Sequence, residues 1–490
     1  LLLLLLLPLL ALTLPSPAKS KEDEETRKNG DLSYMREKLV VIGKRTAEQL
    51  KEQEAKRTPA VRTFIDNVIK KEKEKVHATV LKTGDDVARV NEIAGVSSSF
   101  YGGDIILTRY SFHFKDQMDL IISAGEEKGE EGRERRQAYR DSNYPNTIWN
   151  TGFYYYFDST TKGTHVETVT RRAIKHWSDN TCINFYESST ASHKVRITRN
   201  TGCWSYVGRT SYATQNLSLG DGCDHVGIAM HEIGHALGFF HEQARHDRDY
   251  YVHIQSQNIQ SGATSQFDKQ TTATNYNYDR VYDYGSVMQY KGAAFSSNGS
   301  PTMVAADSQQ QETLGSYILS FRDIVEMNDH YGCRSLCNGH STKCYYDGFA
   351  HPRNCSSCLC PLGFGGSDCS QRPAGCGQTF SATTSGGSFS GTVGDTSTTI
   401  YDDFAYCIYW IYAPAGMRVK ATLSILKTTH CVGGCTYGGI EFKQQPSLTG
   451  PRFCCDTDVN KVIYSNSNVM PIIVYHRYHY LQFGVTYVAF

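Results

Sequence analysis

HEIGHALGFFHE, residues 231–242, is the stretch that decides how this chain folds and what chemistry it can support. On a helix, His231 and His235 lie four positions apart, so both imidazoles project from the same face. Gly238 is where this helix can end, because glycine tolerates the left-handed conformation that turns the chain back. That turn would bring His241 towards the other two histidines. Three imidazoles and an open fourth coordination position are typical of a catalytic zinc site.

The complete pattern H-E-x-x-H-x-x-G-x-x-H is that of metzincin peptidases, which also carry a methionine turn downstream. The segment SVMQY at 286–290 supplies a candidate for that turn, with Met288 at its centre. Glu232 lies beside the first histidine and points in another direction, so it is free to act as a general base. The alternatives are a closed structural zinc site and a histidine-rich helix without metal. Structural sites usually recruit cysteine, and no cysteine lies inside the motif.

Composition and cysteine content indicate an extracellular protein. Lys and Arg together equal Asp and Glu at 50 each, which removes any argument for nucleic acid or an anionic membrane as a partner. Sixteen cysteines indicate an oxidising compartment. The apolar run 1–14 is shorter than the ~20 residues that span a bilayer, so we expect residues 1–18 to be a secretory signal. The run lacks an initiating Met, so we expect the sequence to begin inside that signal. We expect no membrane span.

Residues 19–136 contain no cysteine and are rich in Lys and Glu. Mixed charge with scattered Val, Ile and Leu predicts solvated, partly disordered helices rather than a packed domain. The segment ends in the basic run RERR at 133–136, and Arg-x-Arg-Arg in an exposed polar stretch favours cleavage after Arg136 by a processing protease. The alternative is that this run is only a solvated group of charges. We predict that residues 19–136 are a propeptide, which cleavage after Arg136 would remove.

Globular patterning begins at Asn143, where aromatic residues increase and charge falls. Apolar residues at helical spacing predict a half-buried helix over 166–177. Alternation over 195–198 predicts a strand, which could be at the edge of a sheet. Residues 320–331 predict a last helix, with Ser320 as its N-cap.

The chain beyond Cys333 has a different amino-acid composition. Six cysteines between 337 and 369 lie among Gly, Pro and Ser, and a unit this small needs disulfides to be stable. The C-x-C step at 358–360 has the spacing of an EGF module. The C-x-x-C step at 355–358 could instead indicate zinc, but six cysteines in a secreted chain favour disulfides. From Cys376 onward, short β-rich runs separated by turn residues predict an all-β sandwich.

The chain resembles an astacin metallopeptidase with EGF-like and CUB domains, of the kind common in nematodes. The histidine motif continues into EQARHDRD at 242–249, which is nearly an astacin signature, and GCWSYVGR at 202–209 is similar to another segment of the family. The resemblance implies an α+β fold with a zinc cleft between two subdomains, one Zn²⁺ per chain, and hydrolysis of protein substrates. It also implies the following domains: signal peptide 1–18, propeptide 19–136, peptidase 137–335, EGF-like 336–370 and CUB 371–490.

The resemblance further assigns roles to single residues. YGGD at 101–104 resembles the prosegment motif F-x-G-D, so Asp104 would bind the zinc and block it; the alternative is a simple turn before a strand at 105–107. Tyr290 would be a fifth zinc ligand at rest and would later stabilise the oxyanion. Met288 would form an apolar floor under the metal. Glu242 would receive the new N-terminus after cleavage.

Covalent features follow from the same resemblance and from short motifs. The implied disulfides are Cys182–Cys333, Cys203–Cys223, Cys337–Cys355, Cys344–Cys358, Cys360–Cys369 and Cys376–Cys407. The pairing of Cys431, Cys435, Cys454 and Cys455 stays open. Asn-x-Ser acceptors predict glycans at Asn216 and Asn298.

We therefore expect an active secreted endopeptidase, with the EGF-like and CUB domains positioning substrate or binding extracellular matrix. Cuticle or matrix processing, hatching and tissue penetration all fit such an enzyme. One alternative is an inactive binding protein, which would need a defect in Glu232 or in a ligand, and none is present. The other is a structural matrix protein with incidental zinc.

Overall fold

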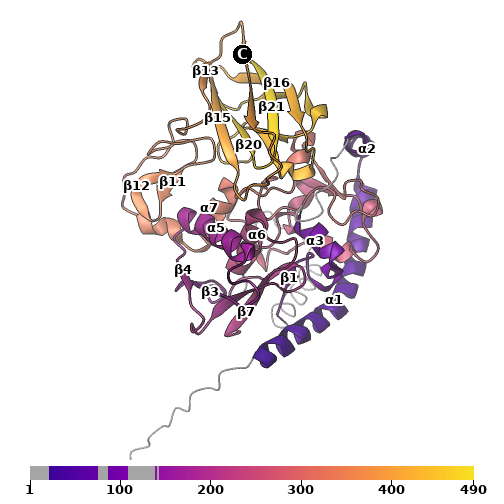
Figure 1. Cartoon of the computed structure of the whole chain (residues 1–490). Helices are drawn as coiled ribbons and strands as arrows, with labels where there is room; N and C mark the ends of the chain where they lie inside the picture. Colours follow the sequence, from indigo (N-terminus) through magenta and orange to yellow (C-terminus); the bar gives the residue numbers. More distant parts are fainter. Residues whose placement is uncertain (1–20, 76–85, 109–137, 141–142) are drawn as a thin grey trace, which may run out of the picture.

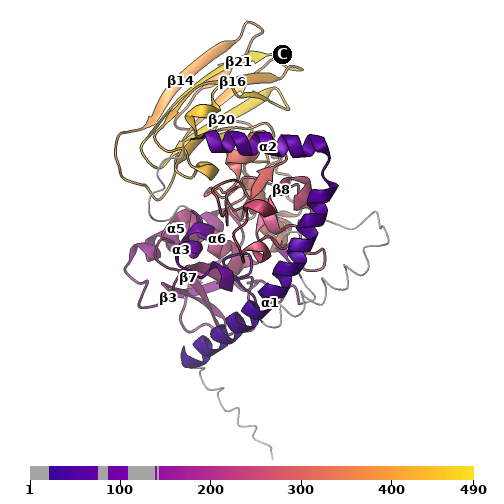
Figure 2. The same cartoon turned by 90° about the vertical axis from the view of Figure 1, so that its right-hand side faces the viewer.

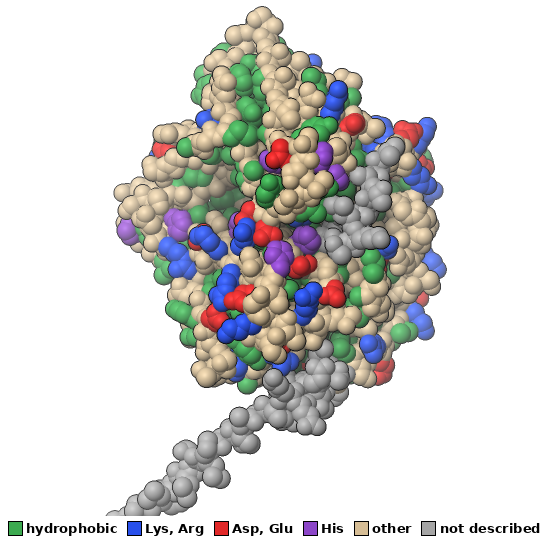
Figure 3. Space-filling model, in the orientation of Figure 1, with side chains coloured by type: hydrophobic (Ala, Val, Ile, Leu, Met, Phe, Trp, Pro, Cys, Tyr) green, Lys and Arg blue, Asp and Glu red, His purple; other side chains and the backbone are tan. Residues whose placement is uncertain are grey.

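The computed structural model of the chain describes residues 21–75, 86–108, 138–140 and 143–490 (Figure 1). The expected signal peptide and the processing site at Arg136 lie outside these residues. Within them, no helix combines the length and the apolar character that a membrane crossing requires. Acidic and basic side chains are interspersed over the face shown in Figure 3, in keeping with their equal numbers.

The N-terminal segment (21–75 and 86–108) contributes three helices: α1 (Lys21–Lys56), α2 (Pro59–Glu74) and α3 (Val87–Ile93). Helix α1 runs along one side of the central domain, and α2 then turns across towards the C-terminal end of the molecule (Figure 2). The predicted helices are present, but the expectation that they are solvated is wrong. Met35, Leu39 and Ile42 recur on one helical face and are buried against Tyr206 and Phe240 of the central domain.

A six-stranded sheet forms one half of the central domain, in the order β1-β6-β7-β5-β3-β4. Its strands are β1 (Ile105–Ile106), β3 (Phe153–Phe157), β4 (Phe185–Glu187), β5 (Lys194–Thr198), β6 (Cys203–Tyr206) and β7 (Thr214–Leu219). The N-terminal segment supplies β1, which pairs parallel with β6. The suggestion of a sheet edge at 195–198 is wrong, because β5 is hydrogen-bonded to β7 on one side and to β3 on the other.

Two helices pack against this sheet and carry the central core. Helix α5 (His165–Asn180) buries Val166, Val169, Ala173, Ile174 and Trp177, which confirms the predicted amphipathic helix. Helix α6 (Val226–Leu237) is buried along its whole length because it lies between α5 and the part of the domain that contains Val287 and Met288. Helix α7 (Phe321–His330) begins at the predicted cap, Ser320, in a capping box with Asp323.

The other half of the central domain is less regular. It holds short two-stranded pairs, β8 (Val252–Ile254) with β10 (Met303–Ala305) and β2 (Ala138–Tyr139) with β9 (Asn275–Tyr276). Together with the six-stranded sheet and its helices, this half confirms the predicted α+β class.

Two further units complete the chain. A cysteine-rich module contains the hairpin β11 (Phe349–His351) and β12 (Asn354–Leu359). The C-terminal sandwich packs the sheet β13-β15-β20-β17-β18 against the sheet β14-β21-β16-β19, which confirms the predicted all-β unit. Its strands are β13 (Thr379–Ser381), β14 (Gly387–Gly394), β15 (Ala405–Tyr412), β16 (Val419–Thr428), β17 (Gly438–Phe442), β18 (Arg452–Phe453), β19 (Val462–Tyr464), β20 (Val469–His476) and β21 (Tyr480–Ala489).

All sixteen cysteines lie in the described residues and are paired. The central domain holds Cys182–Cys333 and Cys203–Cys223. The module holds Cys337–Cys355, Cys344–Cys358 and Cys360–Cys369. The sandwich holds Cys376–Cys407 and the two pairs that the sequence left open, Cys431–Cys455 and Cys435–Cys454.

Candidate metal centre

Helix α6 and the turn after it bring three histidines together. His231 and His235 project from one face of α6, and the helix ends at Gly238, whose φ of 118° lies in the left-handed region. A Cβ atom at position 238 would lie 2.8 Å from Nε2 of His330, so close packing also requires glycine there. The reversed chain then brings a ring nitrogen of His241 within 4.8 Å of a ring nitrogen of each of the other two histidines.

Hydrogen bonds fix the direction of two of these rings. The Nδ1–H of His231 donates to the carbonyl of Val287, and that of His235 donates to the carbonyl of Phe239, both at 2.7 Å. Nε2 therefore carries the lone pair on each ring. The two Nε2 atoms lie 3.1 Å apart. Two lone pairs at this distance repel each other unless a cation lies between them.

The donor set fits zinc. Tetrahedral zinc with Zn–N distances of about 2.0–2.1 Å separates two nitrogen ligands by roughly 3.3 Å, close to the spacing of the two Nε2 atoms. Burial lowers the pKa of His235, and it lowers the pKa of His241 to about 4. Both imidazoles are therefore neutral at physiological pH, which is the form that binds metal.

A carboxylate from the N-terminal segment completes the cluster. Asp104 Oδ2 lies 3.0 Å from Nε2 of His231 and 3.2 Å from Nε2 of His241. Burial alone would raise the pKa of Asp104, but the facing imidazoles lower it well below the usual value. The structure therefore brings an ionised carboxylate to the position where a fourth metal ligand would bind.

Two glycines allow this approach. A Cβ atom at Gly102 would lie 2.7 Å from Nδ1 of His241, and one at Gly103 would lie 2.6 Å from Cζ of Phe295. Both glycines have positive φ values, 64° and 102°. Larger residues would push the carboxylate of Asp104 away from the histidines. The alternative to a blocking role for Asp104 was a simple turn before a strand. The turn and the strand β1 are both present, but the turn also brings Asp104 into the histidine cluster.

Glu232 is buried beside the cluster without a partner. It is 0% exposed, and neither carboxylate oxygen has a hydrogen-bond partner among the described residues. Burial and repulsion by Asp104 raise the pKa of Glu232 well above the usual value. A buried carboxyl group of this kind can accept and return a proton at a reacting centre.

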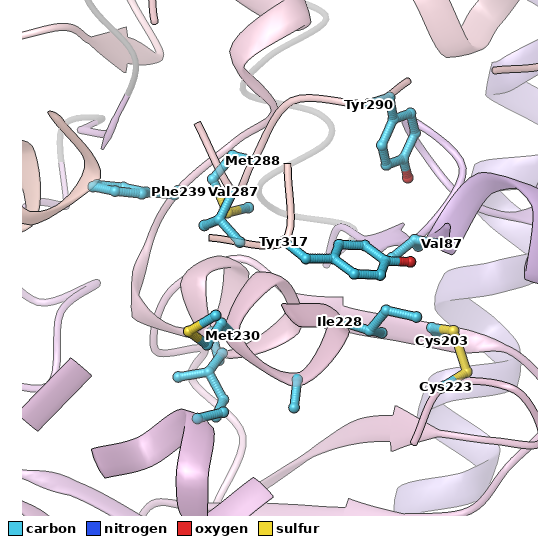
Figure 4. Packing of buried hydrophobic residues seen from close by; sticks show 14 of the residues in the cluster. Val87, Cys203, Cys223, Ile228, Met230, Phe239, Val287, Met288, Tyr290 and Tyr317 are labelled. Atoms are coloured by element: carbon cyan, nitrogen blue, oxygen red, sulfur yellow. A yellow bond between two sulfur atoms is a disulfide. The ribbon is translucent and has the colours of Figure 1, made fainter. Parts of the chain in front are cut away.

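Met288 packs directly against the histidine helix, α6. It is fully buried, and a Cβ atom at Gly234 of α6 would lie 2.7 Å from its sulfur. Figure 4 shows Met288 and Val287 facing α6, with Tyr290 further along the same loop. The turn is held by Asp323, whose carboxylate accepts hydrogen bonds from Ser286 Oγ at 2.6 Å and from the amide of Val287 at 2.9 Å.

No pattern in the sequence predicted this role of Asp323. The capping signal at 320–323 is visible in the sequence, but its contact with the methionine turn joins residues far apart in the chain.

Tyr290 lies against two of the histidines. Its ring centroid is 4.4 Å from that of His241 and 5.8 Å from that of His231. The hydroxyl is buried and has no hydrogen-bond partner within the described part of the chain. Burial and the nearby Asp104 raise the pKa of Tyr290, so the phenol is protonated and can donate a hydrogen bond. Gln289 beside it donates to the carbonyl of Tyr290 at 2.8 Å.

Glu242 follows the third histidine and is 1% exposed. It accepts hydrogen bonds from Arg245 Nη1 at 3.0 Å and from the amide of Asp283 at 2.8 Å. No pattern in the sequence predicted this contact of Arg245. In this structure, Glu242 is already paired within the central domain.

The two predicted glycosylation sites differ in exposure. Asn298 is exposed. Asn216 lies in β7, is 2% exposed, and accepts a hydrogen bond from Nε of Arg196 at 2.9 Å. The expectation of a glycan at Asn216 is wrong for the folded chain, because no sugar fits around a side chain enclosed in this way.

Comparison with known proteins places these residues in context. Residues 141–332 match the peptidase family described as Astacin. Zinc metalloproteinase nas-31 of Caenorhabditis elegans is 41% identical over 466 residues, covering 93% of this chain and 75% of the relative. Zinc metalloproteinase nas-32 of the same organism is 36% identical over 86% of this chain and 64% of its own length.

One solved structure is also similar. It is high choriolytic enzyme 1, a hatching enzyme zinc-protease from Oryzias latipes (medaka fish), which is 31% identical over 40% of this chain and 94% of its own, with a TM-score of 0.35. The chain thus spans three quarters of the first curated relative and slightly less than two thirds of the second.

Proposed function

Because the chain belongs to the astacin family of zinc metallopeptidases, we propose that it is made as a secreted zymogen and becomes active when it is cleaved after Arg136. It is a metalloendopeptidase that acts on proteins and uses one zinc ion per chain. The observation that carries the proposal is the convergence of His231, His235 and His241 on one buried point next to the carboxylate of Asp104.

The three histidines are the zinc ligands in this proposal. When bound there, zinc polarises the scissile carbonyl and lowers the pKa of an attacking water to about 7. Glu232 accepts the proton of that water and delivers it to the leaving amine. Its burial without a partner supports this role, because nothing else in the described chain competes for the carboxylate. Tyr290 donates a hydrogen bond from its phenol to the oxyanion that develops, and Met288 packs against the histidine helix.

Latency rests on the N-terminal segment. Asp104 occupies the space that water and substrate need, and the segment adds β1 to the edge strand β6. Cleavage after Arg136 would release both contacts. In this scheme, residues 1–18 are the signal peptide, 19–136 the propeptide, 137–335 the peptidase domain, 336–370 an EGF-like domain and 371–490 a CUB domain. After processing, the new N-terminus would approach Glu242.

Secretion and setting complete the proposal. Eight disulfides are stable in an extracellular compartment, and Asn298 is exposed and can carry a glycan. We place the enzyme in the processing of cuticle or extracellular matrix, with hatching and tissue penetration as related tasks. The EGF-like and CUB domains would bind the matrix or the substrate.

Metal removal tests the proposed function. The processed chain should cleave denatured protein, lose that activity after exhaustive chelation, and regain it when one equivalent of Zn²⁺ is returned. A mock-chelated sample is the control. Hydrolysis that is undiminished in the verified absence of metal would refute the proposal.

A further inference from the structure

Helix α2 of the N-terminal segment lies where the central domain meets the C-terminal sandwich (Figure 2). Its apolar residues Ile65 and Val68 are buried against Val304 of β10. The helix ends at Glu74, and the next residue, Lys75, reaches both folding units. The N-terminal segment is therefore fastened at a second place, away from the histidine cluster.

Three carboxylates surround the ammonium group of Lys75. Its Nζ atom lies 3.0 Å from Oε1 of Glu72 on its own helix and 3.4 Å from Oδ1 of Asp458 in the sandwich. It also forms a short ion pair with Oε1 of Glu312 in the central domain. The Lys75 side chain is only 8% exposed. Burial lowers its pKa, but the carboxylates raise the pKa by more, so the ammonium stays charged.

The two acceptors outside α2, Glu312 and Asp458, are termed the acidic pair. Glu312 belongs to the short 3-10 helix Ser308–Thr313, and Asp458 ends the 3-10 helix Asp456–Asp458. Oδ2 of Asp458 accepts a hydrogen bond from the amide of Cys455 at 3.1 Å, and the disulfide Cys431–Cys455 anchors that residue. The position of Asp458 is therefore fixed by the sandwich and does not depend on Lys75.

A cavity of about 640 Å³ lies beside this junction. Phe295 lines it, and the ring centroid of Phe295 is 5.9 Å from that of Tyr290. Glu312 also lines the cavity, together with Val432 of the sandwich. Residues of α2 and α3 line it as well. Removing the N-terminal segment would therefore open the cavity further.

Release of the segment would also remove Glu72 and Lys75 from the junction. The acidic pair would then lack the ammonium group that lies between its two carboxyl groups. A new cationic group would recover the attraction in a partly desolvated environment, where charge-assisted hydrogen bonds are strong. The site already accommodates the ammonium group of Lys75, which lies at the end of a long flexible side chain.

We propose that the acidic pair forms a subsite for a Lys or Arg side chain of the protein substrate, remote from the scissile bond. Because Asp458 belongs to the sandwich, the C-terminal unit takes part directly in choosing substrates. Lys75 occupies the subsite in the unprocessed chain and so blocks it together with the catalytic centre. This inference rests on the proposed function.

Peptide selection tests the subsite independently of catalysis. The full chain carrying Glu232→Gln is processed after Arg136 and immobilised, and peptides are selected from a random library of synthetic peptides. Bound peptides should show Lys or Arg at one fixed position. The enrichment should disappear with Asp458→Asn. It should persist with Asp456→Asn, which alters an exposed carboxylate two residues away.

Glu312→Gln provides a second variant in the other folding unit and should also abolish the enrichment. The inference would be overturned if the Glu232→Gln chain selected no peptides with Lys or Arg at a fixed position. It would also be overturned if this enrichment were equal in all variants. A selected peptide with Lys at that position should then be cleaved by the processed wild type with a kcat/KM about tenfold higher than its Gln counterpart. Failure of the wild type to cleave any peptide would count against the proposed function, while the selection would still decide the subsite.

Discussion

Oδ2 of Asp104 lies 3.0 Å from Nε2 of His231, although 127 positions separate the two residues in the chain. The contact joins the N-terminal segment to the helix that carries the metal-binding motif. It is buried at both ends, since Asp104 is 0% and His231 is 4% exposed. In the proposed zymogen, the carboxylate would exclude both water and substrate from the histidine cluster until the segment is released.

Replacing Asp104 should make the unprocessed chain active. In Asp104→Asn a neutral amide replaces the carboxylate and is a much poorer zinc ligand, so the block should weaken. Hydrolysis of a quenched fluorescent peptide by the uncleaved chain should rise at least about tenfold, the change that about 1.4 kcal/mol produces. Asp66→Asn on the exposed face of α2 is the matched control. An uncleaved Asp104→Asn chain that is as inactive as the uncleaved wild type would argue against Asp104 as the residue that blocks the metal centre.

Replacing Glu232 should separate metal binding from catalysis. Glu232→Gln keeps the shape of the side chain but removes its basicity, so kcat should fall by about 10²–10⁴. The zinc content should stay at one per chain, because the three histidines are unchanged. Metal analysis and kcat are measured on the same processed sample, with the exposed Glu187→Gln as control. Normal turnover in the Gln variant would exclude Glu232 as the base.

Tyr290→Phe removes one hydroxyl and leaves the buried ring in place. If the phenol stabilises the oxyanion, kcat should fall by about 10²–10³, the usual cost of losing one such donor. Zinc content and KM should change little. Tyr154→Phe, on the sheet away from the cluster, serves as the control. A variant with unchanged kcat would show that Tyr290 only packs against the histidines.

The local part of the site could be predicted from the sequence because helical geometry fixes it. The spacing of His231, His235 and Gly238 determines one helix face and one helix end, and the structure shows both. The expected cap at Ser320 and the half-buried helix near Trp177 follow from equally short patterns. Such features depend only on residues within a few positions of one another.

The parts that were missed depend on distant residues. Strand β5 looked like an edge, yet β7 and β3 cover both of its sides. The Asn216 motif says nothing about burial, which depends on the neighbouring strand β5, where Arg196 is hydrogen-bonded to Asn216. Lys75 belonged to a charged run that looked solvated, and only the fold brings Glu312 and Asp458 to it.

The buried His330 should make the chain sensitive to acid. It is 0% exposed, its Nδ1 is hydrogen-bonded to the hydroxyl of Tyr278 at 2.9 Å, and burial lowers its pKa to about 3. The unfolded chain takes up this proton near pH 6.5. The stabilisation from neutral His330 is therefore complete above pH 6.5 and is lost as the pH falls towards 3, by about 1.4 kcal/mol per pH unit.

His330→Gln removes this titration, so the unfolding temperature should depend less steeply on pH between 6 and 4. The measurement uses the Glu232→Gln background to prevent self-digestion. His340→Gln, at an exposed position, is the control. Identical pH dependence in the parent and in His330→Gln would show that His330 is not the proton acceptor that limits acid stability.

The disulfide Cys182–Cys333 joins residues that are 151 positions apart, and the whole histidine motif lies inside the loop that it closes. A single backbone break anywhere in the loop leaves the two fragments tethered through sulfur. An enzyme molecule whose backbone is cleaved once within this loop would therefore migrate like the intact chain on a gel run without a thiol reductant. Only after reduction would the two fragments separate and reveal the damage.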